Sequence, residues 1–369
     1  MNYYFKNCLL LGFALLLTFH LGAQNKIDSL NLALNKAKGA SKIDCMIELS
    51  WEYFYYNQND KCIENAHNAL KLANESKNKT QEARSLNMLA IVNSQLNQLD
   101  EAREFANRAI QASLEGENKK EEANALNLLG ILSEQTNEYD KSIEFHSKAL
   151  ELRRLIADKS GIAKSLNNMG NIYSNRGWFD KAIKVFKEAL IIYEEEGDIR
   201  GTAAANTNIG NIYLQQGKTD LAIEYSQKAL KLFEQIDFKN GIAVTLNVNG
   251  LIYENLKNYK KAIEYYEKAL EIHELIGNPF GMSNALNNIG NAYSLQDSFQ
   301  KAIDYYQQAL KVRTEIGDNP GIAISLQTIG LVYTDWKKHD SALIFYTQAL
   351  EINESLENKK EIANNLAAI

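Results

Sequence analysis

Hydrophobic residues along most of the chain recur with the period of an α-helix. Between residues 161 and 200 two such faces follow one another. The first face has the spacing i, i+3, i+6 and i+7 and consists of Leu166, Met169, Ile172 and Tyr173. The second consists of Ala182, Ile183, Phe186, Ala189, Leu190 and Ile192. This stretch therefore predicts two amphipathic helices that are joined by a short turn.

The helix pair recurs along almost the whole chain. Residues 41–360 divide, without insertion, into eight blocks of 40 residues, and a ninth block begins at Glu361. Position 29 of the block is Ala in all eight, and position 10 is Gly from the third block onward: Gly130, Gly170, Gly210, Gly250, Gly290 and Gly330. A glycine inside a helix costs about 1 kcal/mol in helix propensity, so we expect a neighbouring helix to approach closely there. A period of this length is typical of solenoid architectures.

Short polar side chains stand where the helices are expected to begin. An Asp lies between the two helices of most blocks, and we expect it to cap the second helix: Asp60, Asp100, Asp140, Asp180, Asp220 and Asp340. An Asn or Asp is expected to cap the first helix of the following block: Asn78, Asn118, Asp158, Asp198, Asn278, Asp318 and Asn358. Pro279 and Pro320 follow two of these caps, where a missing backbone N–H is tolerated.

The repeat resembles the tetratricopeptide repeat (TPR). The family's spacing of an aliphatic residue, Gly and Tyr, followed by Ala, an aromatic residue and Ala, is matched at Ile209, Gly210, Tyr213, Ala262, Tyr266 and Ala269. The resemblance covers residues 41–369, and the 40-residue period is similar to the repeats of kinesin light chains and spindle-orientation adaptors. It implies an all-α fold, an α-solenoid in which helix-turn-helix repeats form a right-handed superhelix with the first helices on the concave face. It also implies that the partner is a protein or an extended peptide.

The two ends of the chain differ from the repeats. Residues 1–23 resemble a secretory signal peptide, because Lys6 precedes an apolar run of about 12 residues and a bilayer span needs roughly 20. Export to the periplasm or cell envelope is therefore expected, with an uncleaved membrane anchor as the alternative. Residues 24–40 are expected to cap the first repeat through a helix over 27–37. Residues 361–369 form either the start of a ninth repeat or a C-terminal cap.

Composition and motifs argue against several classes of function. The net charge of −6 provides no basic field for nucleic acid, and membrane contact is expected only if the N-terminal segment stays uncleaved or the parent chain continues. The 3 cysteines include no CxxC pair, and the 5 histidines no pair at i, i+4, so neither a metal nor a cofactor is expected. No nucleophile elbow, P-loop or dinucleotide-binding motif occurs, which predicts that the protein is not an enzyme.

Asparagines form the first candidate binding surface. They stand at position 7 of five blocks, where Thr207 and Gln327 fill two gaps, and at position 11 of three. These positions are four residues apart and share a face of the first helix, and the residues are Asn87, Asn127, Asn167, Asn171, Asn211, Asn247, Asn287 and Asn291. An amide can both donate to and accept from the backbone of an extended peptide. The sequence therefore predicts peptide binding along this stripe. The alternatives are an asparagine ladder that bonds helix to helix, or a lineage rich in asparagine.

The first block contains a second candidate, a possible aromatic anchor at the N-terminal mouth of the groove. It consists of Trp51, Phe54 and Tyr55, and the alternative is that these rings pack against the capping helix. In the same block Cys45 and Cys62 are expected to be small buried thiols, with a disulfide between the two helices as the alternative.

These observations predict an exported, non-enzymatic scaffold that binds a peptide or protein segment in a concave groove. The alternative is the periplasmic sensing region of a larger bacterial signalling protein, of the histidine kinase, cyclase or transcription-regulator type.

Overall fold

The computed structural model describes residues 26–56 and 58–369, so the predicted signal peptide over residues 1–23 lies outside the described residues. Every regular element in the described ranges is a helix, and no strand occurs in them. Ahead of the repeats, residues 26–36 are helical. This helix contacts the first repeat: Ile27 is buried, and Lys26 Nζ lies 2.6 Å from Glu52 Oε1.

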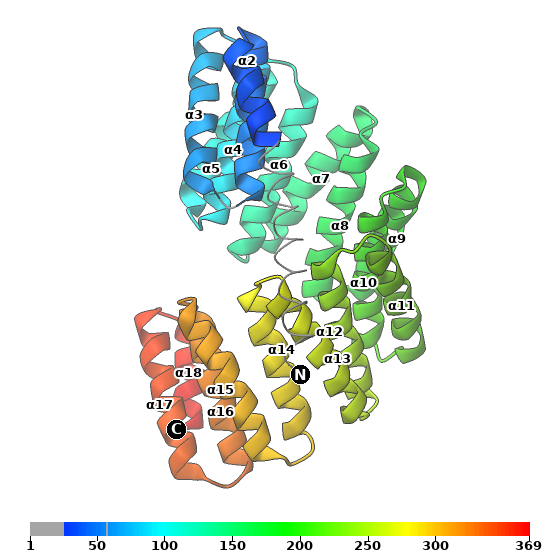
Figure 1. Cartoon of the computed structure of the whole chain (residues 1–369), viewed down its shortest axis with the longest axis vertical. Coiled ribbons are helices and arrows are strands. Elements are labelled where there is room, and N and C mark those ends of the chain that lie inside the picture. The colour runs from blue at the N-terminus through cyan, green and yellow to red at the C-terminus, as the bar shows by residue number, and fades with distance from the viewer. Residues whose placement is uncertain (1–25, 57) are drawn as a thin grey trace, which may run out of the picture. The chain divides into compact units, whose positions relative to one another are not determined.

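The described part of the chain divides into two compact units, of which the first ends at Trp178 and the second begins at Phe179. Figure 1 labels the helices of both units. After residues 26–36, unit 1 contains α2 (Ala40–Tyr55), α3 (Asn59–Glu75), α4 (Lys79–Gln95), α5 (Leu99–Glu115), α6 (Lys119–Gln135), α7 (Tyr139–Leu155) and α8 (Lys159–Asn175). Unit 2 contains α9 (Phe179–Glu196), α10 (Ile199–Gln215), α11 (Thr219–Gln235), α12 (Lys239–Asn255), α13 (Tyr259–Leu275), α14 (Pro279–Ser294), α15 (Phe299–Glu315), α16 (Asn319–Asp335), α17 (His339–Ser355) and α18 (Lys359–Ala368).

Within each unit the helices form a series of antiparallel pairs. The even-numbered helices from α2 to α16 are the first helices of the repeats, and the odd-numbered helices from α3 to α17 are the second helices. Each helix packs against the preceding and the following helix in its unit, and first helices of successive repeats also touch, as α4 does α6 and α12 does α14. The predicted all-α solenoid is therefore confirmed.

The capping prediction is confirmed for the first helices. The Asn or Asp before each of seven of them accepts a hydrogen bond from the backbone N–H three residues later; Asp158 Oδ1, for example, accepts from Gly161 N at 3.0 Å. Pro279 and Pro320 lie in the first turn of α14 and α16, as expected.

The prediction for the second helices is wrong. These helices begin one residue before the Asp, so that Asp100, for example, is the second residue of α5, and the cap residue Gln98 makes no side-chain capping bond. The same holds at Asp60, Asp140, Asp220 and Asp340. A carboxylate in the first turn still stabilises the helix, because it faces the positive end of the helix dipole.

The turns explain why the second helices begin before the Asp expected to cap them. From the turn after α3 onward, one residue at each turn has a positive φ. These residues recur every 20 positions, from Lys77 (φ 54°) and Asn97 (φ 60°) to Lys337 (φ 60°) and Glu357 (φ 53°). The left-handed residue reverses the chain at a fixed point. The next residue then occupies the cap position whatever its side chain.

The glycines at position 10 receive a large side chain from the second helix of the same repeat. A Cβ added to Gly250 would lie 2.2 Å from the ring of Tyr266, and Gly130, Gly290 and Gly330 face His146, Tyr306 and Tyr346 in the same way. Gly210 differs because its partner is Ser226: there an added Cβ would lie 3.3 Å from the backbone oxygen of Ala222, which is the close helix approach that the sequence predicts.

Repeats without this glycine also lack the ring. Position 10 is Ser50 in the first block and Ala90 in the second, and the facing residues are Ala66 and Ala106. We call a glycine at position 10 with a ring at position 26 a ring–glycine pair. Two small residues at these positions, as in Ala90 with Ala106 or Gly210 with Ser226, are a small–small pair. The core of every repeat is filled by one or the other.

Candidate functional site

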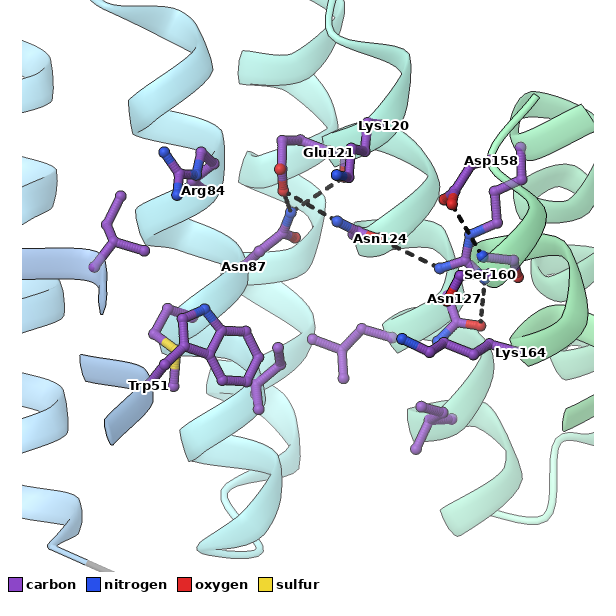
Figure 2. Close-up of a pocket in the computed structure, with 17 residues that line it drawn as sticks. Trp51, Arg84, Asn87, Lys120, Glu121, Asn124, Asn127, Asp158, Ser160 and Lys164 are labelled. Carbon is purple, nitrogen blue, oxygen red and sulfur yellow. Dashed lines mark hydrogen bonds between the residues drawn. The ribbon is translucent and has the colours of Figure 1, made fainter. Parts of the chain in front are cut away.

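The first helices of unit 1 enclose a pocket of about 510 Å³ (Figure 2). It lies between α2, α4, α6 and α8, with one contribution from α7. Its lining residues are Ile47, Trp51, Arg84, Asn87, Met88, Ile91, Lys120, Glu121, Asn124, Asn127, Leu128, Ile131, Arg153, Asp158, Ser160, Gly161 and Lys164. Most of them stand at positions 4, 7, 8 and 11 of the blocks, and we call the surface formed by positions 4, 7 and 11 of the first helices the first-helix face.

One part of the pocket is apolar. Ile47, Met88 and Leu128 are buried beneath it and belong to the cores of their repeats. Trp51, Ile91 and Ile131 occupy position 11 of successive first helices, and each is only partly buried. Their exposed faces form an apolar strip, which can accept aliphatic or aromatic side chains of a ligand.

The other part of the pocket is a continuous chain of hydrogen bonds, which can be followed along the dashed lines in Figure 2. Asn87 Nδ2 donates to Glu121 Oε2 at 3.0 Å and to the backbone oxygen of Glu121 at 3.1 Å. Asn124 Nδ2 donates to the same carboxylate oxygen at 3.3 Å. Arg153 then donates to Asn124 Oδ1 at 3.3 Å and to Asn127 Oδ1 at 3.4 Å. These hydrogen bonds therefore fix the orientation of three side-chain amides, one on α4 and two on α6.

Arg153 anchors this chain from beneath. Its guanidinium is buried and donates to the backbone oxygen of Gly161 at 3.0 Å and to Ser165 Oγ at 2.6 Å. Burial lowers the pKa of Arg153, and the nearby Asp158 carboxylate partly opposes that shift. A side chain at Gly161 would collide with the arginine, since an added Cβ would lie 2.8 Å from Arg153 Cδ. Position 1 of the fourth block therefore has to be small.

His146 approaches the same amides from α7. Its Nδ1 lies 3.2 Å from Asn127 Oδ1, and its ring is fully buried against Gly130. Burial, together with the positive charge of Arg153, lowers the pKa of His146 to about 4. The imidazole is therefore neutral near pH 7.

The exposed charges of the pocket are positive, whereas its two carboxylates, Glu121 and Asp158, are partly buried and accept hydrogen bonds. Lys120 and Lys164 are exposed on its rim, and neither forms an ion pair within the described part of the chain. Arg84 is paired with Asp44, and Glu48 lies 4.0 Å away. The Glu121 carboxylate already accepts hydrogen bonds from the amides of Asn87 and Asn124. An anionic group of a ligand would therefore meet two free ammonium groups.

The structure brings together two of the predicted asparagines, Asn87 and Asn127, at this pocket. Both connect neighbouring helices, because Asn87 donates to α6 and Asn127 Oδ1 accepts from Asn168 Nδ2 of α8 at 3.2 Å. This is the ladder that the sequence raises as an alternative. Ligand binding through these amides stays a prediction.

The other predicted asparagines lie outside the pocket. Asn167 and Asn171 are partly buried on α8 in unit 1. In unit 2, Asn211, Asn247 and Asn287 are partly buried, and Asn291 is exposed. Asn291 Oδ1 accepts a hydrogen bond from Tyr306 Oη at 2.5 Å.

The three predicted anchor rings contact one another, with centroids 5.9–6.1 Å apart, but their surroundings differ. Trp51 and Phe54 both pack against the buried core around Cys62 and Leu89, but of these two only Trp51 also lines the pocket. Tyr55 is 67% exposed and does not line the pocket. Only Trp51 is therefore placed to meet a ligand in the pocket.

Cys45 and Cys62 are both free thiols. Cys62 is fully buried, and its burial raises the pKa of the thiol to about 12. Cys45 is partly buried.

Sequence reasoning missed the charged residues of the pocket and one of its amides, namely Arg84, Lys120, Glu121, Arg153, Lys164 and Asn124. For three of them, Arg84, Asn124 and Lys164, a signal exists at position 4 of the blocks. This position is polar in the early repeats (Asp44, Arg84, Asn124, Lys164) and alternates between apolar and amide residues later.

Comparisons with known proteins agree with this architecture. A family model described as tetratricopeptide repeat matches residues 53–115, 121–195, 161–235, 201–275, 241–315 and 281–355. No curated protein sequence matches the chain.

Solved structures share the fold at low sequence identity. A Rap protein complexed with Competence and Sporulation Factor is 14% identical, with a TM-score of 0.61, and the match covers 88% of this chain and 96% of that one. The apo form of RapI is 18% identical, with a TM-score of 0.59 and coverage of 75% and 99%. A signal transduction ATPase with a tetratricopeptide repeat sensor from Pyrococcus horikoshii is 16% identical, with a TM-score of 0.63 and coverage of 91% and 54%.

Two features are absent from residues 26–56 and 58–369. None of the helices in these ranges is long and apolar enough to span a bilayer. In the same residues, no three His, Cys, Asp or Glu side chains are grouped so that they could hold a metal ion.

Proposed function

Because this chain belongs to the tetratricopeptide repeat family, we propose that it is an exported, non-enzymatic scaffold that binds a peptide or protein segment on its first-helix face. The observation that carries the proposal is the pocket of unit 1, in which an apolar strip lies beside fixed amides and two free lysines.

The chemistry of the pocket favours a particular ligand. The strip formed by Trp51, Ile91 and Ile131 suits an apolar side chain, because its burial removes both surfaces from water. Lys120 and Lys164 suit a carboxylate, which they meet without having to break an existing ion pair. We therefore expect an extended segment that carries an apolar residue close to an Asp or Glu.

Selection from a random peptide library on the mature chain tests this function. Enriched peptides should combine an apolar residue with an acidic one. For a selected peptide, the double variant Lys120→Glu and Lys164→Glu should lower the affinity at least tenfold, since a hydrogen bond to a charged group contributes about 1.5–3 kcal/mol.

The control reverses the charge of a lysine that lies outside the pocket. Lys71 is exposed on α3, a second helix, and does not line the pocket. Lys71→Glu should leave the affinity unchanged. Equal losses per reversed charge in the control and in the double variant would show that net charge alone attracts the peptide. Enrichment of peptides that bind the double variant normally would refute the pocket as the site.

The contribution of the asparagines can be separated from their structural role. Replacing Asn87 by Ala should weaken peptide binding if its amide contacts ligand, and should lower the melting temperature if its hydrogen bonds to Glu121 hold α4 to α6. A measurement of affinity and of melting temperature on the same variant distinguishes the two roles.

One comparison favours a second arrangement, in which these repeats are the sensing region of a larger signalling protein. The chain aligns with 54% of the Pyrococcus horikoshii ATPase, whose repeats are described as a sensor. The parent reading frame decides between the arrangements: a downstream kinase, cyclase or DNA-binding segment would favour the sensor.

A further inference from the structure

The first-helix face of unit 2 contains the same scaffold as the pocket of unit 1 but different exposed side chains. Residues four repeats apart occupy equivalent positions, so that Arg153 and Asn124 correspond to Arg313 and Asn284. The buried contacts are retained: Arg313 donates to the backbone oxygen of Gly321 at 2.8 Å, to Ser325 Oγ at 2.8 Å and to Asn284 Oδ1 at 3.4 Å. Arg313 therefore ties α14 to α16 as Arg153 ties α6 to α8.

The cations of the pocket are absent at the equivalent positions in unit 2. Arg84, Lys120 and Lys164 correspond to Val244, Phe280 and Ile324. Val244 is 44% exposed and Ile324 52%, and at position 11 of the same helices Leu251 is 36% and Leu331 55% exposed. The helices α12 and α16 thus each present two exposed aliphatic side chains that are two helical turns apart.

The helix between them presents amides. Asn284 and Asn291 stand at positions 4 and 11 of α14, and both are exposed. The oxygen of each amide is held from within the repeat, because Asn284 Oδ1 accepts from Arg313 and Asn291 Oδ1 from Tyr306 Oη. Each amide nitrogen is therefore turned away from the buried donor, and neither nitrogen has a hydrogen-bond partner within residues 26–56 and 58–369.

Unit 1 shows why the first of these donors, the nitrogen of Asn284, is free. There the amide nitrogen of Asn124 donates to Glu121 Oε2, whereas the residue equivalent to Glu121 in unit 2 is Gly281. The loss of that carboxylate leaves the nitrogen of Asn284 available for a ligand.

We propose that the first-helix face of unit 2 is a second docking surface, which binds an uncharged, extended segment of a partner protein. The surface consists of Val244, Leu251, Asn284, Asn291, Ile324 and Leu331. None of these side chains is charged, and the same is true of Asn247, Asn287 and Gln327 at position 7 of the three helices. A charged segment would lose its hydration without gaining an ion pair, so an uncharged partner is the complementary one.

The amides distinguish an extended segment from a helix. Two free N–H donors need carbonyl acceptors, and an extended chain exposes its backbone carbonyls, whereas a helix uses all but the last few internally. The apolar residues of the bound segment then pack on the aliphatic pairs of α12 and α16. The proposal extends the scaffold function and does not depend on the pocket of unit 1.

The test uses a short synthetic peptide in which leucine alternates with glutamine, with blocked ends and a polyethylene glycol tail for solubility. Its binding to the mature chain is measured by fluorescence anisotropy. The double variant Asn284→Asp and Asn291→Asp keeps the oxygens that Arg313 and Tyr306 need and removes both donors. It should weaken binding roughly five- to a hundredfold at unchanged melting temperature, because two hydrogen bonds are lost.

A second variant tests the aliphatic pairs. Val244→Arg and Ile324→Lys install the residues that unit 1 carries at these positions, so the fold tolerates them, and they should abolish binding of the neutral peptide. The control Gln307→Glu with Gln308→Glu adds the same charge as the Asp variant on the second helix α15, where both glutamines are exposed, and should bind normally.

Three results would overturn the proposal: no binding of the neutral peptide to the unaltered chain, unchanged affinity in both the Asp and the Arg/Lys variants, or equal binding of a helical peptide with the same composition. Lys120→Glu with Lys164→Glu separates this proposal from the pocket of unit 1, because these changes should leave the neutral peptide bound.

Discussion

The ring–glycine pair makes a quantitative prediction about the repeat core, best tested at Gly250 and Tyr266. Tyr266 is fully buried, and its ring lies where a side chain on residue 250 would have to stand, with a distance of 2.2 Å to an added Cβ. Gly250→Ala should therefore destabilise the protein by about 1–3 kcal/mol, the usual cost of overpacking. This holds although alanine is the better helix former by about 1 kcal/mol.

The effect of Gly250→Ala on stability should change sign when the Tyr266 ring is removed. Tyr266→Ala alone should cost about 3–5 kcal/mol, as truncation of a buried aromatic side chain does. In that background Gly250→Ala recreates the small–small pair that Ala90 and Ala106 form in the second repeat. The helix propensity of alanine is then no longer opposed by a clash, so the second substitution should stabilise by up to about 1 kcal/mol.

Urea denaturation of the four proteins in this cycle measures the effect. The difference between the two Gly250→Ala steps, a coupling energy of about 2–4 kcal/mol, is the predicted quantity. Gly217→Ala is the control, since nothing lies within 4 Å of its added Cβ and its φ of 69° is unfavourable for alanine with or without the ring. Additive effects of Gly250→Ala and Tyr266→Ala would refute the argument that glycine is present to receive the ring.

Three further predictions concern single groups. The pKa of His146 is about 4 in the folded protein and about 6.5 in the unfolded chain. Between these pH values only the unfolded chain binds a proton at this residue. The free energy of unfolding should therefore fall by up to about 1.4 kcal/mol per pH unit as the pH drops from 6.5 to 4. His146→Tyr, in which the hydroxyl can reach Glu134 as Tyr266 Oη reaches Glu254 at 3.1 Å, should reduce this slope in urea titrations at several pH values. Cys62 should react with Ellman's reagent far more slowly than Cys45 in the native protein, because its thiol is buried and its pKa is raised to about 12. Mass spectrometry of protein from the cell envelope should find Gln24 as the first residue, as expected for cleavage of a signal peptide after Ala23.

Each of these predictions has a clear contrary outcome. An equal pH slope in the His146→Tyr variant would mean that other groups, among them His273 with its pKa lowered by burial, dominate the acid response. Equal reaction rates of the two thiols would contradict the packing of the first repeat. An intact Met1 in the cytosolic fraction would contradict export.

The repeat and its first-helix caps could be predicted from the sequence because both depend on local chemistry. Asn78 and Asp158, for example, accept backbone hydrogen bonds three residues ahead, as short polar side chains at this position do. Asp100 is predicted to cap α5, but the cap residue is Gln98, two residues earlier, because the left-handed Asn97 rather than capping preference sets where the helix begins. Asparagine tolerates this conformation, but Lys77 and Lys337 also adopt it, so residue type does not reveal the turn.

The candidate site was less predictable because it depends on contacts between repeats. The asparagine pattern pointed to the face on which the pocket lies, and whether that face binds a ligand stays a prediction. The pattern could not show that Asn87 donates to Glu121, 34 residues away, or that Arg153 reaches back to Asn124. Such contacts connect positions that no helical period relates. Comparing the same position across blocks does reveal part of them, since Arg84 and Lys164 change to Val244 and Ile324 in the later repeats.

The ring–glycine pairs also bear on how the length of such an array can change. Gly250, Gly290 and Gly330 all face a tyrosine, so the last three complete repeats have interchangeable interiors. Removal of residues 281–320 would join two repeats in which His273 meets Gly321 in place of Gly281, again a large side chain against a glycine. Duplication or loss of one whole repeat here therefore gives a junction of the same kind, in which a large side chain again packs against a glycine. The early repeats, with their small–small and His146 interiors, lack this property, so insertions and deletions of repeats should accumulate in unit 2.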